Sequence, residues 1–438
     1  MKEFEAAITN LSHDGRGVAR VDGKAVFVSG ALLGENVRLR IRRRHRNFDE
    51  AEVIELLTRS PHRVEPKCRH YGQCSGCSLQ HLDAGAQIEA KQRVLAENFE
   101  RIGKVEPASW LEPLTDQPWG YRRKGRLSVR NVAKKGRVLV GFREEDNPRF
   151  VADIEQCEVV HPSLGPKIGL LAQTISGMDA AGDIAQIEFA AGDDTMALVF
   201  RHLKPLSESD QATLVAFGQA NDLAIYLQPG GISSVHPLWP ESPRLAFRIA
   251  ADDDRTHDVE LEFRPLDFVQ VNAGMNQRMM SRAMALLDPQ PNDRVLDLFC
   301  GLGNFTLPIA RRVAEVAGVE GEHGLVERAG ANATRNGIAN AQFHVANLFE
   351  DQRHASWARE PWSKLLLDPP RAGADKVLEY LPHRQTQRIV YVSCHPGSLA
   401  RDAGILVQKH GFKLVSAGVM DMFPHTAHVE SIALFERG

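Results

Sequence analysis

The last third of the chain shows the most regular alternation of hydrophobic and polar positions. Short apolar runs, each long enough for one buried strand, alternate with stretches of helical periodicity such as 274–287 and those that end near Asn336 and Lys409. Strands that are apolar on both faces are typical of parallel sheets covered by helices. The seven predicted strands are 295–299, 316–320, 341–346, 364–367, 388–393, 413–419 and 429–435. From Phe263 onward we therefore expect a doubly wound α/β domain that ends in an antiparallel hairpin.

Two further elements are expected in this part of the chain. An extended segment, 266–272, precedes the helix at 274–287, and a short helix lies around 377–381. Ligands of such folds bind at the carboxyl ends of the parallel strands.

The first part of the chain has a different pattern, in which short strands are separated by turns. Alternating segments at 4–8, 18–21, 25–28, 36–41 and 50–57 are separated by turn signals such as Asp14-Gly15 and Asp22-Gly23. They predict a small β-barrel. A helical pattern at 88–102 ends at Gly103, and 130–262 is β-rich with one or two short helices. We therefore divide the chain into domains at 1–60, 61–262 and 263–438.

The composition is that of an ordinary globular protein. Of 438 residues, 43% are hydrophobic and 25% are charged. No apolar run approaches the ~18–20 residues of a membrane span, and no signal-peptide pattern opens the chain. We therefore expect a soluble, cytoplasmic protein without a membrane partner. The net charge of -3 does not by itself indicate nucleic acid, but the basic residues are clustered.

Two basic clusters are candidates for contact with RNA phosphates. The first consists of Arg38, Arg40, Arg42, Arg43, Arg44 and Arg46. The second, within 120–130, places Arg122, Lys124 and Arg126 on one face if the segment is a strand. A solvated strand face protected by charge is the alternative for both. We favour RNA contact because so many cations lie so close together.

Polar side chains follow the predicted parallel strands. The run 294–305, RVLDLFCGLGNF, predicts a strand, a glycine turn and a helix that begins at Asn304. The first four strands carry Asp297, Glu320, Asn347 and Asp368 at their carboxyl ends. Helix caps are an alternative for each of them. One nucleoside-containing ligand accounts for all four, because an acidic side chain at this edge can bind ribose hydroxyls.

Four of the six cysteines form a candidate metal site. Cys68, Cys74 and Cys77 have the spacing C-x5-C-x2-C, and Cys157 is a distant fourth. In a large chain without a secretion signal, such thiols favour metal binding over disulfides. Four soft thiolates suit a zinc ion or an iron–sulfur cluster. Buried free cysteines are the remaining alternative.

Cys394 ends the fifth predicted strand, directly before a turn and a helix. A lone cysteine is usually a small buried side chain. A helix N-terminus at the ligand edge can, however, stabilise a thiolate. A thiolate that adds to C6 of a pyrimidine makes C5 nucleophilic enough to take a methyl group from a sulfonium. A base must then remove the C5 proton before the thiol is eliminated.

Several motifs resemble those of known methyltransferases. The stretch 297–304, DLFCGLGN, resembles the first motif of the enzymes that depend on S-adenosylmethionine (SAM). FVQVN at 268–272, DPPR at 368–371, SCHP at 393–396 and DMFPHTAHVE at 421–430 resemble the RNA uracil-5-methyltransferases. The cysteine spacing followed by SLQH resembles the 4Fe-4S motif of that family. The first sixty residues resemble a TRAM domain, an OB-like RNA-binding module.

This resemblance implies a Rossmann-like, seven-stranded methyltransferase domain with Cys394 as the nucleophile and Glu430 as the general base. It implies a 4Fe-4S cluster on Cys68, Cys74, Cys77 and Cys157, with a structural or RNA-shaping role. The residues implied to bind SAM are Gln270, Phe299, Asn304, Glu320, Asn347 and Asp368. The target uracil would lie against Phe268 and Asp368. One departure is His395, where the family has Asn or Asp, and we expect it to tune the turn or the pKa of the cysteine.

The combination of barrel, cysteine motif and catalytic motifs resembles the branch of the family that acts on 23S ribosomal RNA. It implies formation of 5-methyluridine in 23S rRNA, at a base flipped out of its stack. No obligate protein partner is expected. Methylation of another rRNA site or of tRNA is an alternative, as is a catalytically silent RNA-binding protein. The intact Cys394 and Glu430 argue against the last of these.

Overall fold

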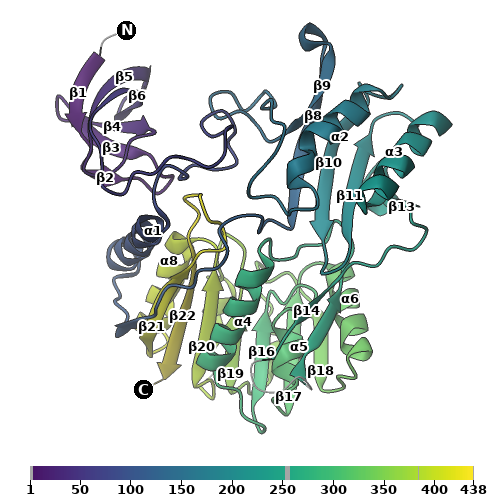
Figure 1. Ribbon diagram of the computed structural model, residues 1–438. Coiled ribbons are helices and arrows are strands. Elements are labelled where there is room, and N and C mark those ends of the chain that lie inside the picture. The colour runs from purple at the N-terminus through teal and green to yellow at the C-terminus, as the bar shows by residue number, and fades with distance from the viewer. Residues whose placement is uncertain (1–2, 252–256, 383, 438) are drawn as a thin grey trace.

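The computed structural model describes residues 3–251, 257–382 and 384–437. Figure 1 shows an N-terminal β-barrel, a central sheet with its helices, and a C-terminal α/β part that lies beneath both. Among the described residues, no helix is long and apolar enough to cross a membrane.

The N-terminal part is a six-stranded sheet in the order β1-β5-β6-β4-β3-β2, which confirms the predicted small β-barrel. Its strands are β1 (Glu3–Ala7), β2 (Asn10–Leu11), β3 (Gly17–Val21), β4 (Lys24–Ser29), β5 (Asn36–Arg44) and β6 (Phe48–Thr58). Val37, Leu39 and Ile41 of β5 point into the barrel core. The alternation of β5 therefore places its arginines on the outer face.

The arginines of β5 are largely paired within the protein. Arg38 forms ion pairs with Glu5 and Glu55, and Arg40 pairs with Glu3. Arg42 bridges to Asp146 of the central part. For Arg38 and Arg40 the structure thus favours the alternative of a charge-protected strand face over direct phosphate contact.

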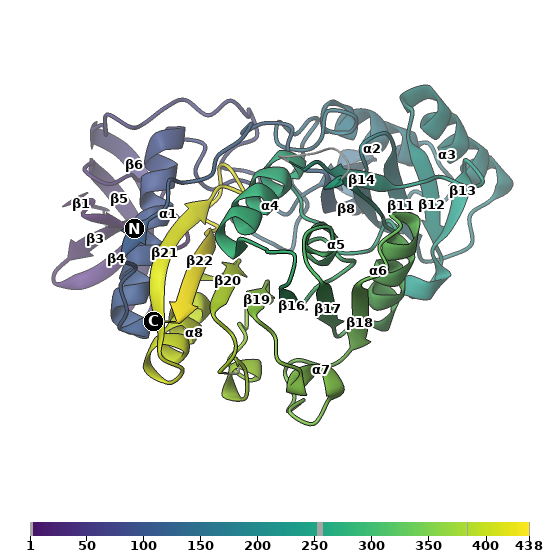
Figure 2. The same ribbon diagram turned by 90° about the horizontal axis from the view of Figure 1, so that it is seen from below.

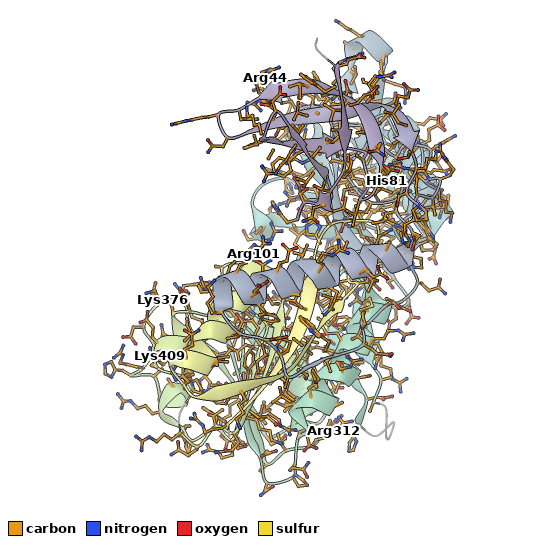
Figure 3. All side chains as sticks on the ribbon, turned by 90° about the vertical axis from the view of Figure 1, so that its left-hand side faces the viewer. Arg44, His81, Arg101, Arg312, Lys376 and Lys409 are labelled. Carbon is orange, nitrogen blue, oxygen red and sulfur yellow. The ribbon has the colours of Figure 1, made fainter. Side chains whose placement is uncertain are left out.

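Helix α1 (Ala84–Asn98) connects the barrel to the C-terminal sheet. Asp83 caps it by accepting a hydrogen bond from the amide of Ala86. Figure 3 shows α1 between the barrel and the sheet below it. At Gly103, which ends the π-helical turn Phe99–Gly103, a Cβ would lie 2.4 Å from the Ala400 carbonyl oxygen, so only glycine allows this approach. Although we assigned this segment to the central domain, it packs on the C-terminal part.

The central sheet has the order β13-β12-β11-β10-β8-β9 and confirms the predicted β-rich region. Its strands are β8 (Lys124–Val132), β9 (Arg137–Gly141), β10 (Ile184–Ala191), β11 (Met196–His202), β12 (Ala224–Gln228) and β13 (His236–Trp239). Helices α2 (Ile168–Ser176) and α3 (Glu208–Asn221) pack against it. The hairpin β14 (Ala246–Ile249) and β15 (Val259–Glu262) leads into the C-terminal part.

The expectation that Arg122, Lys124 and Arg126 form one exposed strand face is wrong. The strand begins only at Lys124, and Arg122 forms isolated bridges with Val160 and Asn272 instead. Lys124 turns inward, where its Nζ donates to the Pro265 carbonyl at 2.6 Å. Arg126 remains at the surface and pairs with Glu188, so only Arg122 lies outside the regular alternation of β8.

The C-terminal sheet has the order β18-β17-β16-β19-β20-β22-β21-β7, with β22 antiparallel to β20 and β21. Its strands are β16 (Arg294–Leu298), β17 (Glu315–Glu320), β18 (Ala341–Val345), β19 (Lys364–Leu367), β20 (Arg388–Ser393), β21 (Phe412–Met420), β22 (Glu430–Arg437) and β7 (Ser109–Trp110). All seven predicted strands are confirmed. The two-residue β7 joins the edge in parallel with β21 and was not expected.

Helices cover both faces of this sheet (Figure 2). They are α4 (Ala273–Leu287), α5 (Thr306–Ala310), α6 (His323–Arg335), α7 (Ser356–Arg359) and α8 (Pro396–Gln408). Leu366 packs in the core with α4, α5 and α6, whereas Leu365 and Leu367 pack in the core with α1, α7 and α8. This alternation explains why consecutive residues of β19 are apolar.

Three details of the predicted α/β pattern are wrong. Residues 266–272 are irregular, apart from the bridge between Asn272 and Arg122. The helix expected at 377–381 is a single 3-10 turn, Val377–Glu379. The helix expected from Asn304 begins at Thr306, because the glycine turn extends further than the sequence pattern indicates.

Candidate active site

The turn after β16 brings backbone donors to the carboxyl ends of the strands. Phe299, Gly301 and Gly303 have φ values of 65°, 56° and 95°. Such a conformation is strained for phenylalanine and is typical of functional turns. The turn places the amide of Gly301 3.2 Å from Oε2 of Glu320, at the end of β17. Phe299 and Glu320 therefore lie on the same edge of the sheet, as predicted.

Asp297 does not belong to the exposed ligand edge. It is fully buried, and Thr306 Oγ1 donates to its Oδ2 at 2.5 Å. Burial, with smaller contributions from the charges of Asp368 and Glu320, raises the pKa of Asp297 to about 8, although the hydrogen bond from Thr306 lowers it. The three carboxyl groups therefore gather at the strand ends, but Asp297 serves to tie β16 to α5.

Asn304 and Asn347 have partners inside the protein. The amide groups of Asn304 and Asn276 exchange two hydrogen bonds, at 3.0 and 3.1 Å. Asn347 is exposed, donates to Glu350 at 2.8 Å, and accepts from the amide of Phe349. In this structure Asn347 thus caps the turn after β18, which is the alternative role considered above.

The segment 268–272 lies against Asp368. Gln270 Nε2 is 3.5 Å from Asp368 Oδ2, and the Phe268 side chain beside it is 65% exposed. Buried Arg123 supports the segment: its Nε donates to the Gln270 carbonyl at 2.7 Å, and its amide donates to the Val271 carbonyl. Burial raises the pKa of Asp368 to about 7.

Cys394 and Glu430 lie side by side at the end of the sheet. Ser393 of β20 pairs with Ser431 of β22, so the next positions on the two antiparallel strands are Cys394 and Glu430. Burial, Glu430 and Asp368 raise the pKa of the Cys394 thiol to about 12, while Arg371 lowers it. Burial, followed by the charge of Asp368, raises the pKa of Glu430 well above its usual range. In the absence of ligands the raised pKa favours the thiol form of Cys394, and stabilisation of a thiolate by the helix stays a prediction.

His395 caps helix α8. Its Nδ1 accepts a hydrogen bond from the amide of Ser398 at 3.1 Å, the contact that an Asn or Asp side chain makes at an N-cap. Acceptance requires a neutral imidazole, and burial together with Arg371 lowers the pKa of His395. The histidine therefore preserves the geometry of the turn that follows Cys394.

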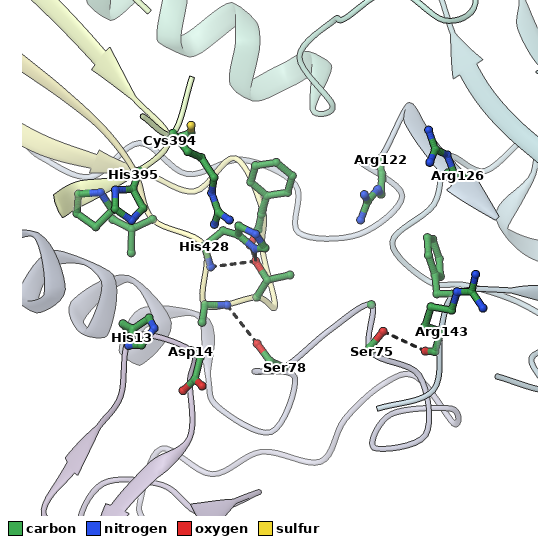
Figure 4. Close-up of a pocket in the computed structure, with 18 of the residues that line it drawn as sticks. His13, Asp14, Ser75, Ser78, Arg122, Arg126, Arg143, Cys394, His395 and His428 are labelled. Carbon is green, nitrogen blue, oxygen red and sulfur yellow. Dashed lines mark hydrogen bonds between the residues drawn. The ribbon is translucent and has the colours of Figure 1, made fainter. Parts of the chain in front are cut away.

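A cavity of ≈ 960 Å³ opens beside Cys394 between the three parts of the chain. Figure 4 shows Cys394 and His395 on one side of it and the arginines of the central part on the other. The residues that line it include His13, Arg122, Arg126, Arg143, Arg371 and Cys394. Arg143 and His13 were missed, because no local motif marks them. Arg371 lies in the DPPR motif but had been given no role.

The four predicted metal ligands come together. Cys68, Cys74, Cys77 and Cys157 line one small cavity, and all four are half-buried free thiols. Within the described part of the chain, no three His, Cys, Asp or Glu side chains lie close enough to hold a single metal ion. A tetrahedral zinc site is therefore not preformed. A cluster in which each thiolate binds a different iron tolerates a wider spacing, so the donor set is compatible with one.

The comparisons with known proteins agree with this geometry. A family model described as tRNA (Uracil-5-)-methyltransferase matches residues 253–438, and a TRAM domain model matches residues 1–54. The chain is 62% identical over 437 residues to the 23S rRNA (uracil(1939)-C(5))-methyltransferase RlmD of Xanthomonas oryzae pv. oryzae strain MAFF 311018. It is 60% identical to the protein of the same name from Stenotrophomonas maltophilia strain K279a. Both alignments cover 99% of this chain and 97% of the relative.

A solved structure has the same fold. The Pyrococcus abyssi tRNA (uracil-54, C5)-methyltransferase in complex with S-adenosyl-L-homocysteine matches with a TM-score of 0.75 at 23% identity. The match covers 98% of this chain and 99% of that one. Because the curated relatives exceed half identity over nearly the full length, the chain belongs to the RNA uracil-5-methyltransferase family.

Proposed function

We propose that this protein transfers a methyl group from SAM to C5 of a uridine in 23S rRNA, giving 5-methyluridine. The observation that carries the proposal is the strand register that places Cys394 beside Glu430. The activity for which relatives at 62% and 60% identity are named supports 23S rRNA as the substrate. The TRAM match and the arginine-lined cavity beside Cys394 support RNA as its chemical class.

The proposed reaction uses Cys394 and Glu430 in sequence. Cys394 gives its proton to solvent, and the thiolate sulfur bonds to C6 of the uracil as the C5–C6 π electrons move toward C5 and O4, which leaves C5 enolate-like. SAM, when bound, supplies the methyl group that C5 takes. Glu430 then accepts the C5 proton, the C5–C6 double bond forms again, and the C6–S bond breaks. Arg371 favours the thiolate, because its charge lowers the pKa of Cys394.

The proposed SAM site follows the strand ends. We assign it to Gln270, Phe299, Asn304, Glu320, Asn347 and Asp368, with Phe268 and Asp368 facing the uracil. The gathering of Glu320, Asp368 and the strained Phe299 turn supports this assignment. The side chain of Asn347 would have to exchange its bond to Glu350 for one to adenine.

A 4Fe-4S cluster on the four cysteines is part of the proposal. Its support is the common cavity of Cys68, Cys74, Cys77 and Cys157, together with the family membership. Protein purified anaerobically should contain about four irons per chain and should be coloured, because an iron–sulfur cluster absorbs visible light. Stoichiometric zinc without iron would overturn this assignment.

The substrate is tested by nucleoside analysis of RNA incubated with the protein and SAM. Unmodified 23S rRNA and unmodified tRNA are offered separately, and 5-methyluridine is measured after digestion. We expect the product in 23S rRNA alone. Product in tRNA alone would retain the reaction and overturn the substrate. Its absence from both would overturn the proposal in favour of a silent RNA-binding protein.

A further inference from the structure

Helix α1 carries a buried lysine that reaches the C-terminal sheet. The side chain of Lys91 is 2% exposed, although lysine is rarely buried without a partner. Its Nζ donates to Asp421 Oδ1 at 2.6 Å and to the Phe423 carbonyl at 3.1 Å. The Asp421 side chain is 11% exposed, so water screens this ion pair little.

The partners of Lys91 lie in the loop that ends at the proposed base. Residues 421–429 join β21 to β22, and Met420 pairs with Glu430 across the hairpin. Lys91 therefore binds the chain at Asp421, one residue beyond the strand partner of Glu430.

Gln87 holds the tip of the same loop from one helical turn earlier. Its Oε1 accepts from the amide of His425 at 2.9 Å, and its Nε2 donates to the Leu79 and Leu82 carbonyls. Residues four apart share a helix face, so Gln87 and Lys91 act on the loop together. The face of α1 that packs on the C-terminal sheet is therefore partly polar, because Gln87 and Lys91 bind the loop of this hairpin.

Among the described residues, Lys91 and Arg371 are the two cations that lower the pKa of Glu430. The charged groups around Glu430 are Asp368 after β19, Arg371 in the following loop, and Lys91 on α1. Burial and Asp368 raise the pKa of Glu430, whereas Lys91 and then Arg371 lower it. Other titratable groups nearby are Cys394, which the charge of Glu430 affects, and His428, whose pKa burial lowers. Loss of Lys91 would raise the pKa of Glu430 further and so favour the protonated carboxyl, which cannot accept the C5 proton.

We propose that Lys91 is a positioning residue for proton removal: through Asp421 and Phe423 it fixes the 421–429 loop that ends at Glu430. The inference rests on the proposed function, because it assigns Lys91 to the step in which Glu430 acts. The inference predicts that replacement of Lys91 impairs only the removal of the C5 proton. Addition of Cys394 and methylation of C5 come earlier, so the methylated covalent adduct should accumulate when Lys91 is uncharged.

The test compares Lys91→Met with Lys91→Arg over a range of pH. Two quantities are measured: tritium release from 5-tritiated uridine in 23S rRNA, and the protein–RNA adduct on a denaturing gel. In Lys91→Met the midpoint of the rate–pH profile should move up by about one unit, so release falls roughly tenfold below the midpoint and recovers at alkaline pH. Adduct should accumulate at neutral pH. Lys91→Arg should keep the midpoint near that of the unsubstituted protein.

Two outcomes would overturn the role of Lys91. One is an equal loss of release in both variants with an unchanged midpoint, which indicates a purely structural role. The other is unchanged release and no adduct. If Lys91→Met does not fold, the double variant Lys91→Met/Asp421→Asn removes both buried charges and must show the same shift. Absence of release from the unsubstituted protein would instead contradict the proposed function itself.

Discussion

Ser393 of β20 pairs with Ser431 of β22, and this register makes Cys394 and Glu430 the next neighbours on the two strands. The proposed nucleophile thus directly follows β20, and the proposed base begins β22, at the same end of one antiparallel ladder. We predict that Glu430→Gln forms a stable covalent adduct with 23S rRNA in the presence of SAM, because addition and methylation do not need the carboxylate. A denaturing gel with radiolabelled methyl groups measures it. Cys394→Ala is the matched control and must give no adduct, and an adduct that survives in it would refute the assignment of the nucleophile.

The hairpin loop 421–429 should become less stable in acid. His425 is buried, stacks on Trp119 with ring centroids 3.9 Å apart, and has its pKa lowered by burial to about 4. Its contribution to stability is therefore complete above its ordinary pKa of 6.5 and is lost as the pH falls toward about 4. His425→Asn keeps the positive φ of 65°, which asparagine tolerates.

Unfolding by denaturant at several pH values measures this effect. Between pH 6.5 and 4, the free energy of unfolding should fall less steeply with falling pH in the variant than in the unsubstituted protein. The two slopes should differ by up to about 1.4 kcal/mol per pH unit, because unfolding of the variant takes up one proton fewer. Buried His81, whose pKa burial also lowers to about 4, remains in both proteins as an internal reference. Identical slopes would show that His425 is not neutral in the folded protein.

Arg123 and Arg126 should separate cofactor binding from RNA binding. Arg123 donates a hydrogen bond to the Gln270 carbonyl, whereas Arg126 lines the cavity beside Cys394. Arg123→Met should weaken binding of S-adenosylhomocysteine roughly tenfold, because a charge-assisted hydrogen bond to the loop is lost. Arg126→Met should leave that affinity unchanged.

RNA titrations at several salt concentrations should give the opposite result, in which Arg126→Met has the larger effect. Arg126→Met should lower the slope of log K against log salt by about 0.7–0.9, which corresponds to one phosphate contact. Calorimetry and filter binding provide the two measurements. Equal effects of both substitutions on both ligands would contradict the separation.

Removal of iron from the proposed cluster should loosen the loop 421–429. Ser78 and Leu79, which directly follow Cys77, both donate their amides to the His425 carbonyl at 2.9 Å, and Ser78 Oγ accepts from the amide of Ala427. The cysteine segment therefore packs directly on the loop that ends at Glu430. After anaerobic chelation, hydrogen exchange should rise in 421–429 and stay unchanged in β16. Unchanged exchange in 421–429 would show that the cysteine segment holds the loop without the cluster.

The buried parallel strands were the easiest elements to predict from the sequence. Lys364–Leu367 and Arg388–Ser393 match the predicted bounds, because both faces of these strands are covered by helices and, apart from polar residues at their ends, their positions are apolar. Residues 266–272 also contain several apolar side chains, yet their backbone bonds to Arg123 and not to a strand. That choice depends on a tertiary contact that no local pattern encodes.

The hydrophobic pattern did not predict the role of α1, because that role also depends on tertiary contacts. Its buried positions are Gln87, Lys91 and Leu95, two of which are polar, so periodicity does not reveal the face that packs on the sheet. Their partners lie in the 421–429 loop, more than three hundred residues away in the sequence. The catalytic pair, by contrast, was recognised from motifs that resemble a known family, and the structure adds the register that brings the two residues together.

The most direct test of the account is tritium release from 5-tritiated uridine in unmodified 23S rRNA, with and without SAM. We predict release that requires SAM, disappears in Cys394→Ala, and equals about one tritium per methyl group transferred. SAM-dependent methylation of 23S rRNA without tritium release, or release that persists in Cys394→Ala, would contradict C5 substitution through Cys394.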